Sequence, residues 1–174
     1  NALTVQHILS HTTGLLPHAY TNLIEEPLPF KKITSKLHSV PFVCQPGGCY
    51  GYQNVAYSLV ADMFPMLRRQ SYEEYVDQEI LRPLNMTDAH YGYRSYLDDD
   101  NRVSPHVWSR RRQAWVPVSV RANYYKVPPA AGLNASISDM ALWLRAQVGQ
   151  FPQVLSADTL DAMHSKVVRT SRRQ

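Results

Sequence analysis

The sequence predicts a mainly α protein that carries one small β-hairpin. Hydrophobic residues make up 44% of its 174 residues and charged residues 18%, which is typical of a globular protein that buries a core. In several segments apolar residues recur at the spacing of one helix face. Four of these runs follow a residue type that caps helix N-termini, namely Thr4, Ser71, Ser136 and Ser156. In a further segment, two strand-like runs lie on either side of an arginine turn and predict the hairpin.

The first half of the chain predicts short helices separated by loops. The first begins after Thr4 and ends at Gly14, which supplies a left-handed stop. Residues 16–29 read as a wrapping loop, and a second short helix covers residues 30–37. A buried third helix follows Asn54, and Pro65 is expected to kink or break it near residues 61–65, because proline lacks the N–H that a helix interior needs. Its apolar face is Val55, Leu59, Val60, Met63 and Leu67.

The second half contains the clearest helix signals. Ser71 and Glu74 form a capping box that opens a helix to about Leu81. Ser136 and Asp139 are expected to form a second box, and Gly149 to end that helix. Its apolar face is Ile137, Met140, Ala141, Leu144 and Val148.

The other segments of this half are a loop, the hairpin and a last helix. Residues 91–100, rich in tyrosine and then in aspartate, predict a surface loop. Residues 103–108 and 114–120 predict the two strands, which Pro105 and Pro117 restrict to edge positions. A final helix runs from the N-cap Ser156 to about His164, with Leu155 and Leu160 as a hydrophobic staple.

The net charge of +4 does not by itself indicate an anionic partner. The basic residues gather in the arginine turn, residues 110–112, and in the terminal residues 169–173, and neither cluster lies on a helix face. No nucleic-acid motif accompanies them, so we expect no nucleic-acid partner. No apolar run approaches the roughly 18 residues of a transmembrane segment, and none is expected.

The cysteines and histidines predict no metal site and no cofactor. Cys44 and Cys49 flank a Gln-Pro-Gly-Gly turn without the further ligands of a zinc site. A small disulfide loop and two free thiols are both compatible with this spacing. His7 and His11 lie four residues apart, but Ile8 stands where a zinc protease needs glutamate. We expect His11 to cap the last turn of its helix and to hydrogen-bond locally.

The stretch from Pro46 to Asn54 has the composition of a site. Its glycines and proline force an irregular backbone, and Tyr52 and Asn54 then deliver a phenol and an amide at the start of an apolar helix. Asn54 is expected to cap that helix. A buried tyrosine followed by an ordinary N-cap would give the same pattern.

Four segments, in this order, resemble one family. They are His11-Thr12-Thr13-Gly14-Leu15, Tyr52-Gln53-Asn54, Arg82-Pro83-Leu84-Asn85-Met86-Thr87-Asp88, and Pro129-Ala130-Ala131-Gly132-Leu133 with Ser138-Asp139-Met140-Ala141. They are similar to motifs of the penicillin-recognising serine hydrolases of the class C β-lactamase type, which include esterases and D-alanyl-D-alanine peptidases. The resemblance covers residues 3–148.

The resemblance implies an acyl-enzyme mechanism in which the serine of a Ser-x-x-Lys motif is the nucleophile. Tyr52 would be the general acid/base, and Asn54 would orient the lysine and the substrate amide. The substrate would be a small molecule or a peptide, and the protein periplasmic or exported. A phenol with a pKa near ~10 accepts a proton at neutral pH only beside cations that stabilise phenolate, so a lysine partner is required.

The sequence departs from the family at that requirement. None of its five lysines lies three residues after a serine, and neither Lys-Thr-Gly nor His-Thr-Gly occurs. In the family, the nucleophile precedes the first of the four segments and the third motif follows the last. The resemblance therefore implies that residues 1–174 are one domain, the helical subdomain of a larger β-lactamase/transpeptidase-like α/β fold, with residues 165–174 as a tail.

Two expectations follow from this departure. The chain alone should be inactive, because it lacks the nucleophile. Helices that would pack on an absent sheet should expose apolar stripes, which could lead to self-association. Two alternatives remain: a catalytically dead relative that binds peptidoglycan-like peptides, and a helical interaction module whose motifs match by chance.

Overall fold

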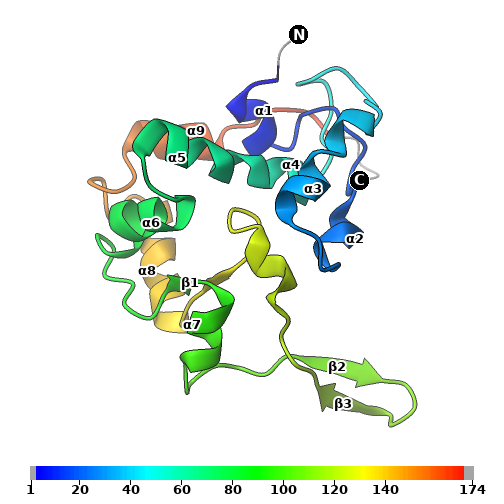
Figure 1. The fold of residues 1–174 in the computed structure, drawn as a ribbon. Helices are drawn as coiled ribbons and strands as arrows, with labels where there is room; N and C mark the ends of the chain where they lie inside the picture. Colours follow the sequence, from blue (N-terminus) through cyan, green and yellow to red (C-terminus); the bar gives the residue numbers. More distant parts are fainter. Residues whose placement is uncertain (1–2, 171–174) are drawn as a thin grey trace.

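The computed structural model describes residues 3–170 and confirms the mainly α fold with a small hairpin (Figure 1). Its α-helices are α1 Val5–Leu9, α2 Thr21–Ile24, α3 Phe30–Thr34, α4 Asn54–Tyr57, α5 Phe64–Arg68, α6 Tyr72–Val76, α7 Tyr93–Asp98, α8 Ile137–Gln147 and α9 Ala157–His164. Tighter or wider turns are the 3₁₀ segments η1 Leu37–Ser39, η2 Ser58–Met63 and η4 Ala122–Lys126, and the π segment η3 Asp77–Leu81. The strands are β1 His90–Tyr91, β2 His106–Ser109, β3 Ala114–Pro117 and β4 Leu133–Asn134, which form two antiparallel pairs, β1 with β4 and β2 with β3.

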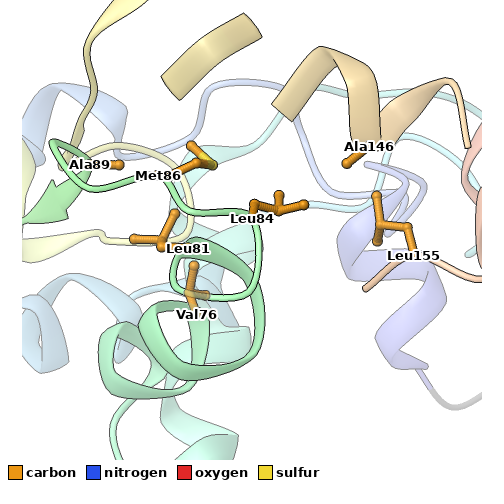
Figure 2. Close-up of a cluster of buried hydrophobic side chains, with 7 residues drawn as sticks. All are labelled: Val76, Leu81, Leu84, Met86, Ala89, Ala146 and Leu155. Atoms are coloured by element: carbon orange, nitrogen blue, oxygen red, sulfur yellow. The ribbon is translucent and has the colours of Figure 1, made fainter. Parts of the chain in front are cut away.

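Three clusters of buried apolar side chains hold these elements together. The largest joins α6, η3, α8 and the turn before α9, as Figure 2 shows, through Val76, Leu81, Leu84, Met86, Ala89, Ala146 and Leu155. The second contains Ile24, Ile33, Val55 and Val127, and the third contains Leu15, Val40 and Ala56. Helix α4 contributes Val55 to one and Ala56 to the other, so its start is fixed from two sides.

Most of the predicted helix starts are confirmed. The Ser71 hydroxyl accepts the Glu74 N–H at 3.1 Å, and the Glu74 carboxylate accepts the Ser71 N–H at 2.7 Å. Thr4 and Ser156 also cap as expected, and Leu155 and Leu160 belong to one apolar cluster. These signals are local, which is why the sequence reveals them.

The second predicted capping box is only half formed. The Ser136 hydroxyl accepts the Asp139 N–H at 3.1 Å. The buried carboxylate of Asp139, however, accepts the N–H of Asp88, 51 residues earlier, at 3.1 Å instead of that of Ser136. The strand pair β1 and β4 joins the same two regions. Asp139 thus fastens the start of α8 to the segment that ends at Asp88.

Three predicted boundaries are wrong. Helix α1 ends at Leu9, and His11 takes the left-handed conformation (φ 56°) before Gly14 is reached. The expected loop over residues 16–29 contains α2. The expected loop over residues 91–100 contains β1 and α7, since Arg94 pairs with Asp98 one turn later and the Tyr96 hydroxyl donates to the Val103 carbonyl.

The predicted break near Pro65 is confirmed, but the burial beyond it is not. A 3₁₀ segment runs to Met63, and α5 restarts at Phe64 with Pro65 in its first turn, where no N–H is needed. Leu67, expected in the core, is 70% exposed. The 3₁₀ segment η2 separates α4 from α5, so the helical spacing that predicts burial of Leu67 is not kept between them.

The apolar face of α8 lies open. Ile137 is 86% exposed, Leu144 62% and Val148 73%, while the helix turns Leu142, Trp143 and Ala146 toward the largest cluster. An exposed stripe of this kind is what the resemblance leads us to expect of a helix that packs on a further layer.

The predicted hairpin and most of the predicted tail lie within the described residues. The hairpin is confirmed and pairs β2 with β3 from His106↔Pro117 to Ser109↔Ala114, but β2 starts later than predicted and extends one residue past the predicted end at Trp108. The predicted tail, residues 165–174, has no helix or strand as far as Thr170, and its last four residues lie outside the described part of the chain. Along the described length, no helix is long and apolar enough to cross a membrane.

Candidate active site

The His-Thr-Thr-Gly-Leu segment and the Tyr-x-Asn segment form one hydrogen-bonded unit. The N–H of Gly51 donates to the His11 carbonyl at 2.8 Å, and the N–H of His18 donates to the Tyr52 carbonyl at 2.8 Å. Between them, the N–H of Gln53 donates to Nδ1 of His11 at 3.2 Å. The backbone on both sides of Tyr52 is therefore held by residues about 40 positions earlier in the chain.

The ring of Tyr52 lies between two imidazoles at the surface. Its centroid is 4.6 Å from that of His11 and 5.5 Å from that of His18. On its other side, His11 stacks on Tyr57 at 4.9 Å. Tyr52 is 38% exposed, and its hydroxyl has no hydrogen-bond partner within residues 3–170. The phenol is thus fixed by its ring and backbone while its oxygen remains free for other groups.

Asn54 is not the N-cap that the sequence predicts. The cap is Gln53, whose side-chain oxygen accepts the Val55 N–H at 3.2 Å and whose amide nitrogen donates to the Leu16 carbonyl at 3.3 Å. Gln53 is long enough to reach both groups and is only 1% exposed. Asn54 becomes the first residue of α4, half-buried, and its amide is not consumed by capping.

The Pro129–Leu133 region also reaches this site. Ala130 and Ala131 pack on the cluster that contains Val55, one residue after Asn54. The structure therefore brings together three of the four segments that carried the resemblance. The remaining segment, Arg82–Asp88, is linked to the Ser138–Ala141 stretch because the Asp139 carboxylate accepts the N–H of Asp88.

Cys44 and Cys49 form a disulfide that closes the loop directly before this site. Inside that loop, the N–H of Gly47 donates to the Thr12 carbonyl at 2.8 Å. The disulfide and the hydrogen bonds to the His11 segment thus both hold the backbone that leads into Tyr52. Across residues 3–170, no three His, Cys, Asp or Glu side chains gather closely enough to hold a metal ion.

The predicted role of His11 as a local helix cap is wrong. Its Nδ1 accepts from Gln53, 42 residues away, because the left-handed turn at His11 points the ring out of the helix and across to the later segment. An Nδ1 that accepts cannot carry a proton, so the ring is the neutral tautomer protonated on Nε2. Burial lowers the pKa of His11 below its ordinary value of 6.5, which keeps it in this form.

This arrangement predicts a pH-dependent loss of stability. Because the native pKa of His11 is lowered, the unfolded chain takes up the proton more readily, and stability falls as the pH drops from 6.5 through the native pKa. NMR titration of the His11 imidazole nitrogens should give a pKa below 6.5. Thermal midpoints of wild type and His11→Phe should differ less at acid pH than at neutral pH. A His11 pKa at or above 6.5 would contradict the assignment.

The Beta-lactamase family model matches residues 1–174. The chain belongs to this family. Among relatives, an unguisins hydrolase of Aspergillus campestris is 22% identical over 169 residues, which cover 95% of this chain and 32% of the relative. This β-lactamase-family chain thus spans about a third of the length of that relative.

Solved structures agree on the fold. The octameric penicillin-binding protein homologue from Pyrococcus abyssi superposes with a TM-score of 0.79 at 21% identity, over 98% of this chain and 40% of that one. A class C β-lactamase gives a TM-score of 0.64 at 17% identity, over 91% of this chain and 40% of the other. The mainly α chain is thus confirmed as a helical part of the β-lactamase/transpeptidase-like fold.

Within residues 3–170, no lysine forms a hydrogen bond with Tyr52. Lys126 is the last residue of η4. Its Nζ donates to the carbonyls of Glu26 at 2.7 Å and Leu28 at 3.2 Å. No Ser-x-x-Lys occurs in the sequence. The sequence predicts Tyr52 and Asn54 as site residues, and the structure adds the ring contact of His18 with Tyr52, for which the sequence holds no local signal.

Proposed function

We propose that this chain supplies the proton-transfer wall of a β-lactamase-family serine hydrolase. In this proposal Tyr52 is the general acid/base and Asn54 orients the substrate amide and the lysine. The observation that carries the proposal is the combination of a rigidly held Tyr52 backbone with an exposed, unbonded hydroxyl. A catalytic group needs this pairing, because its position must be fixed while its reacting atom stays accessible.

The nucleophile in this proposal comes from a Ser-x-x-Lys motif outside the 174 residues. The lysine ammonium would stabilise the phenolate of Tyr52, and the serine would attack the acyl carbonyl to form an acyl-enzyme. The uncommitted amide of Asn54 fits the role of holding that lysine. β-Lactams, esters and D-amino-acid peptides are the proposed substrate classes, and the relatives named as a hydrolase, a penicillin-binding protein homologue and a β-lactamase support this range.

Two further proposals come with this one. We propose an exported or periplasmic location, which rests on the family alone. We also propose that the open stripe of α8, formed by Ile137, Leu144 and Val148, packs against another layer of the fold or, in the isolated chain, against a second copy.

The alternative function is a catalytically dead relative that binds peptidoglycan-like peptides at the same residues. Such a relative would keep the Tyr52 and Asn54 side chains as binding groups without a Ser-x-x-Lys nucleophile elsewhere in the protein. The two functions differ in one property, which is acylation by substrate.

The test compares the 174-residue chain with the full-length protein on a chromogenic β-lactam and on a p-nitrophenyl ester. We expect no burst of product from the 174-residue chain, because it lacks the nucleophile, and turnover of at least one substrate by the full-length protein. A burst from the short chain would overturn the assignment of the nucleophile. Binding without turnover by the full-length protein would establish the dead relative instead.

A further inference from the structure

The β2–β3 hairpin projects from the body of the protein (Figure 1). At its base, the N–H of Val118 donates to the Pro105 carbonyl at 2.9 Å and joins the two arms, and the Tyr93 hydroxyl of α7 donates to the Val120 carbonyl at 3.0 Å. The turn at its far end, residues 110–113, is exposed. The active-site proposal gives this element no role.

The hairpin carries an unusual concentration of positive charge. Residues 103–121 contain four arginines and no aspartate or glutamate, while the whole chain has a net charge of +4. The arginines of the turn, residues 110–112, are exposed and form no salt bridge with any residue between 3 and 170. Clustered charge of one sign, without acidic residues beside it in the segment, gives the tip a positive potential that favours an anionic partner.

Two exposed tryptophans lie directly behind this turn. Trp108 and Trp115 are opposite each other across the strands, with ring centroids 5.7 Å apart and an edge-to-face angle of 71°. They are 47% and 66% exposed. Indole rings are favoured where an apolar environment meets water, as in the headgroup region of a bilayer.

We propose that this hairpin binds the surface of an anionic membrane, tip first. Arg110, Arg111 and Arg112 would contact lipid phosphates, and the Trp108–Trp115 pair would lie at headgroup level. The acidic run Asp98–Asp100 precedes the base, at the end away from the tip, and would be repelled by the surface if the hairpin lay flat.

A bilayer fits these features better than a nucleic acid. Single-stranded nucleic acid is bound by a basic groove along which free aromatic faces receive successive bases. Here the arginines gather at one tip, and the two indoles are held edge to face at 71°, not as a row of parallel ring faces along a groove. A planar anionic surface needs only a protruding basic tip with interfacial side chains behind it.

The test measures co-sedimentation of the 174-residue chain with vesicles of phosphatidylglycerol and phosphatidylcholine in equal parts, and with phosphatidylcholine alone. We expect binding to the anionic vesicles that weakens with salt, together with a blue shift of tryptophan fluorescence. Arg110→Gln/Arg111→Gln/Arg112→Gln should lower the partition coefficient about fivefold per arginine, on the order of 100-fold in all. Trp108→Phe/Trp115→Phe should remove the blue shift, since Trp143 packs against the core cluster.

The matched control is Lys31→Gln/Lys32→Gln/Lys36→Gln, which removes the same charge from exposed positions in and after α3. It should bind anionic vesicles to within a few-fold of wild type. Equal losses in the two triple variants would overturn the proposal in favour of a non-specific net-charge effect. Absence of vesicle binding at low salt, or binding of single-stranded DNA in its place, would also overturn it. Circular dichroism of every variant establishes that the fold is retained.

Discussion

Replacing Tyr52 with phenylalanine is expected to lower kcat/KM of the full-length protein by about 10²–10⁴, the usual contribution of a positioned general acid/base. The substitution removes only the hydroxyl, which has no hydrogen-bond partner in residues 3–170. The ring contacts with His11 and His18 and the backbone hydrogen bonds on both sides of residue 52 stay. The loss should therefore appear in turnover, measured with whichever chromogenic substrate the wild type hydrolyses.

Tyr50→Phe is the matched control for this prediction. Tyr50 is 37% exposed, lies two residues away in the same loop and also contacts His11, with ring centroids 6.0 Å apart. It should keep near-wild-type activity. Both variants should unfold within about 0.5 kcal/mol of wild type, since neither touches a buried interaction. Equal activity of Tyr52→Phe and wild type would refute the assigned role of Tyr52.

The helix starts could be predicted because their signals are complete within a few residues. Ser71 and Glu74 satisfy each other's N–H groups across three positions, and no distant residue competes for either. Asp139 shows the limit of this reasoning. Its carboxylate could accept the backbone N–H of Ser136 in the same way. In the fold it accepts the N–H of Asp88, which lies 51 residues earlier in the chain. Both N–H groups are equivalent donors, and sequence spacing does not show which of them lies close to the carboxylate in the folded protein.

The candidate site likewise has residues that a local motif predicts and contacts that only the fold provides. Tyr52 and Asn54 were identified from a short motif, whereas the support for that motif comes from contacts across about 40 residues. His11 was expected to act within its own helix, and the left-handed turn at that residue sends its ring to Gln53 instead. Only a few per cent of non-glycine residues are left-handed, and although histidine is enriched among them, its presence alone does not predict the turn.

The capping of α4 was misjudged for a related reason. Asparagine is a common N-cap and glutamine is not, so local propensity favours Asn54. Gln53 takes the position because its longer side chain bonds both the Val55 N–H and the Leu16 carbonyl, and the second of these bonds is long-range. Tertiary contact here overrides a local preference, and as a result it leaves the amide of Asn54 available to the site.

The second large effect is expected at Gly14, where the His11 segment passes closest to the disulfide loop. Gly14 has a φ of 80°, and a Cβ added there would overlap the carbonyl oxygen of Cys44. The Val43 N–H donates to the Gly14 carbonyl at 2.8 Å, so the two backbones cannot move apart without losing this bond. The Cβ would therefore push on the loop that leads to Tyr52.

Gly14→Ala should lower the free energy of unfolding by about 2–5 kcal/mol, since left-handed strain costs about 1–2 kcal/mol and forced displacement of packed atoms about 1–3 kcal/mol. Urea unfolding followed by tryptophan fluorescence measures the loss. Gly149→Ala separates the two contributions, because Gly149 has a similar φ of 83° but its nearest neighbour, Leu160, lies 3.8 Å from the added Cβ. That control should lose only the strain, about 1–2 kcal/mol. Equal losses at both positions would mean that Gly14 is needed for its backbone conformation alone, and that the close approach of the two segments does not limit stability.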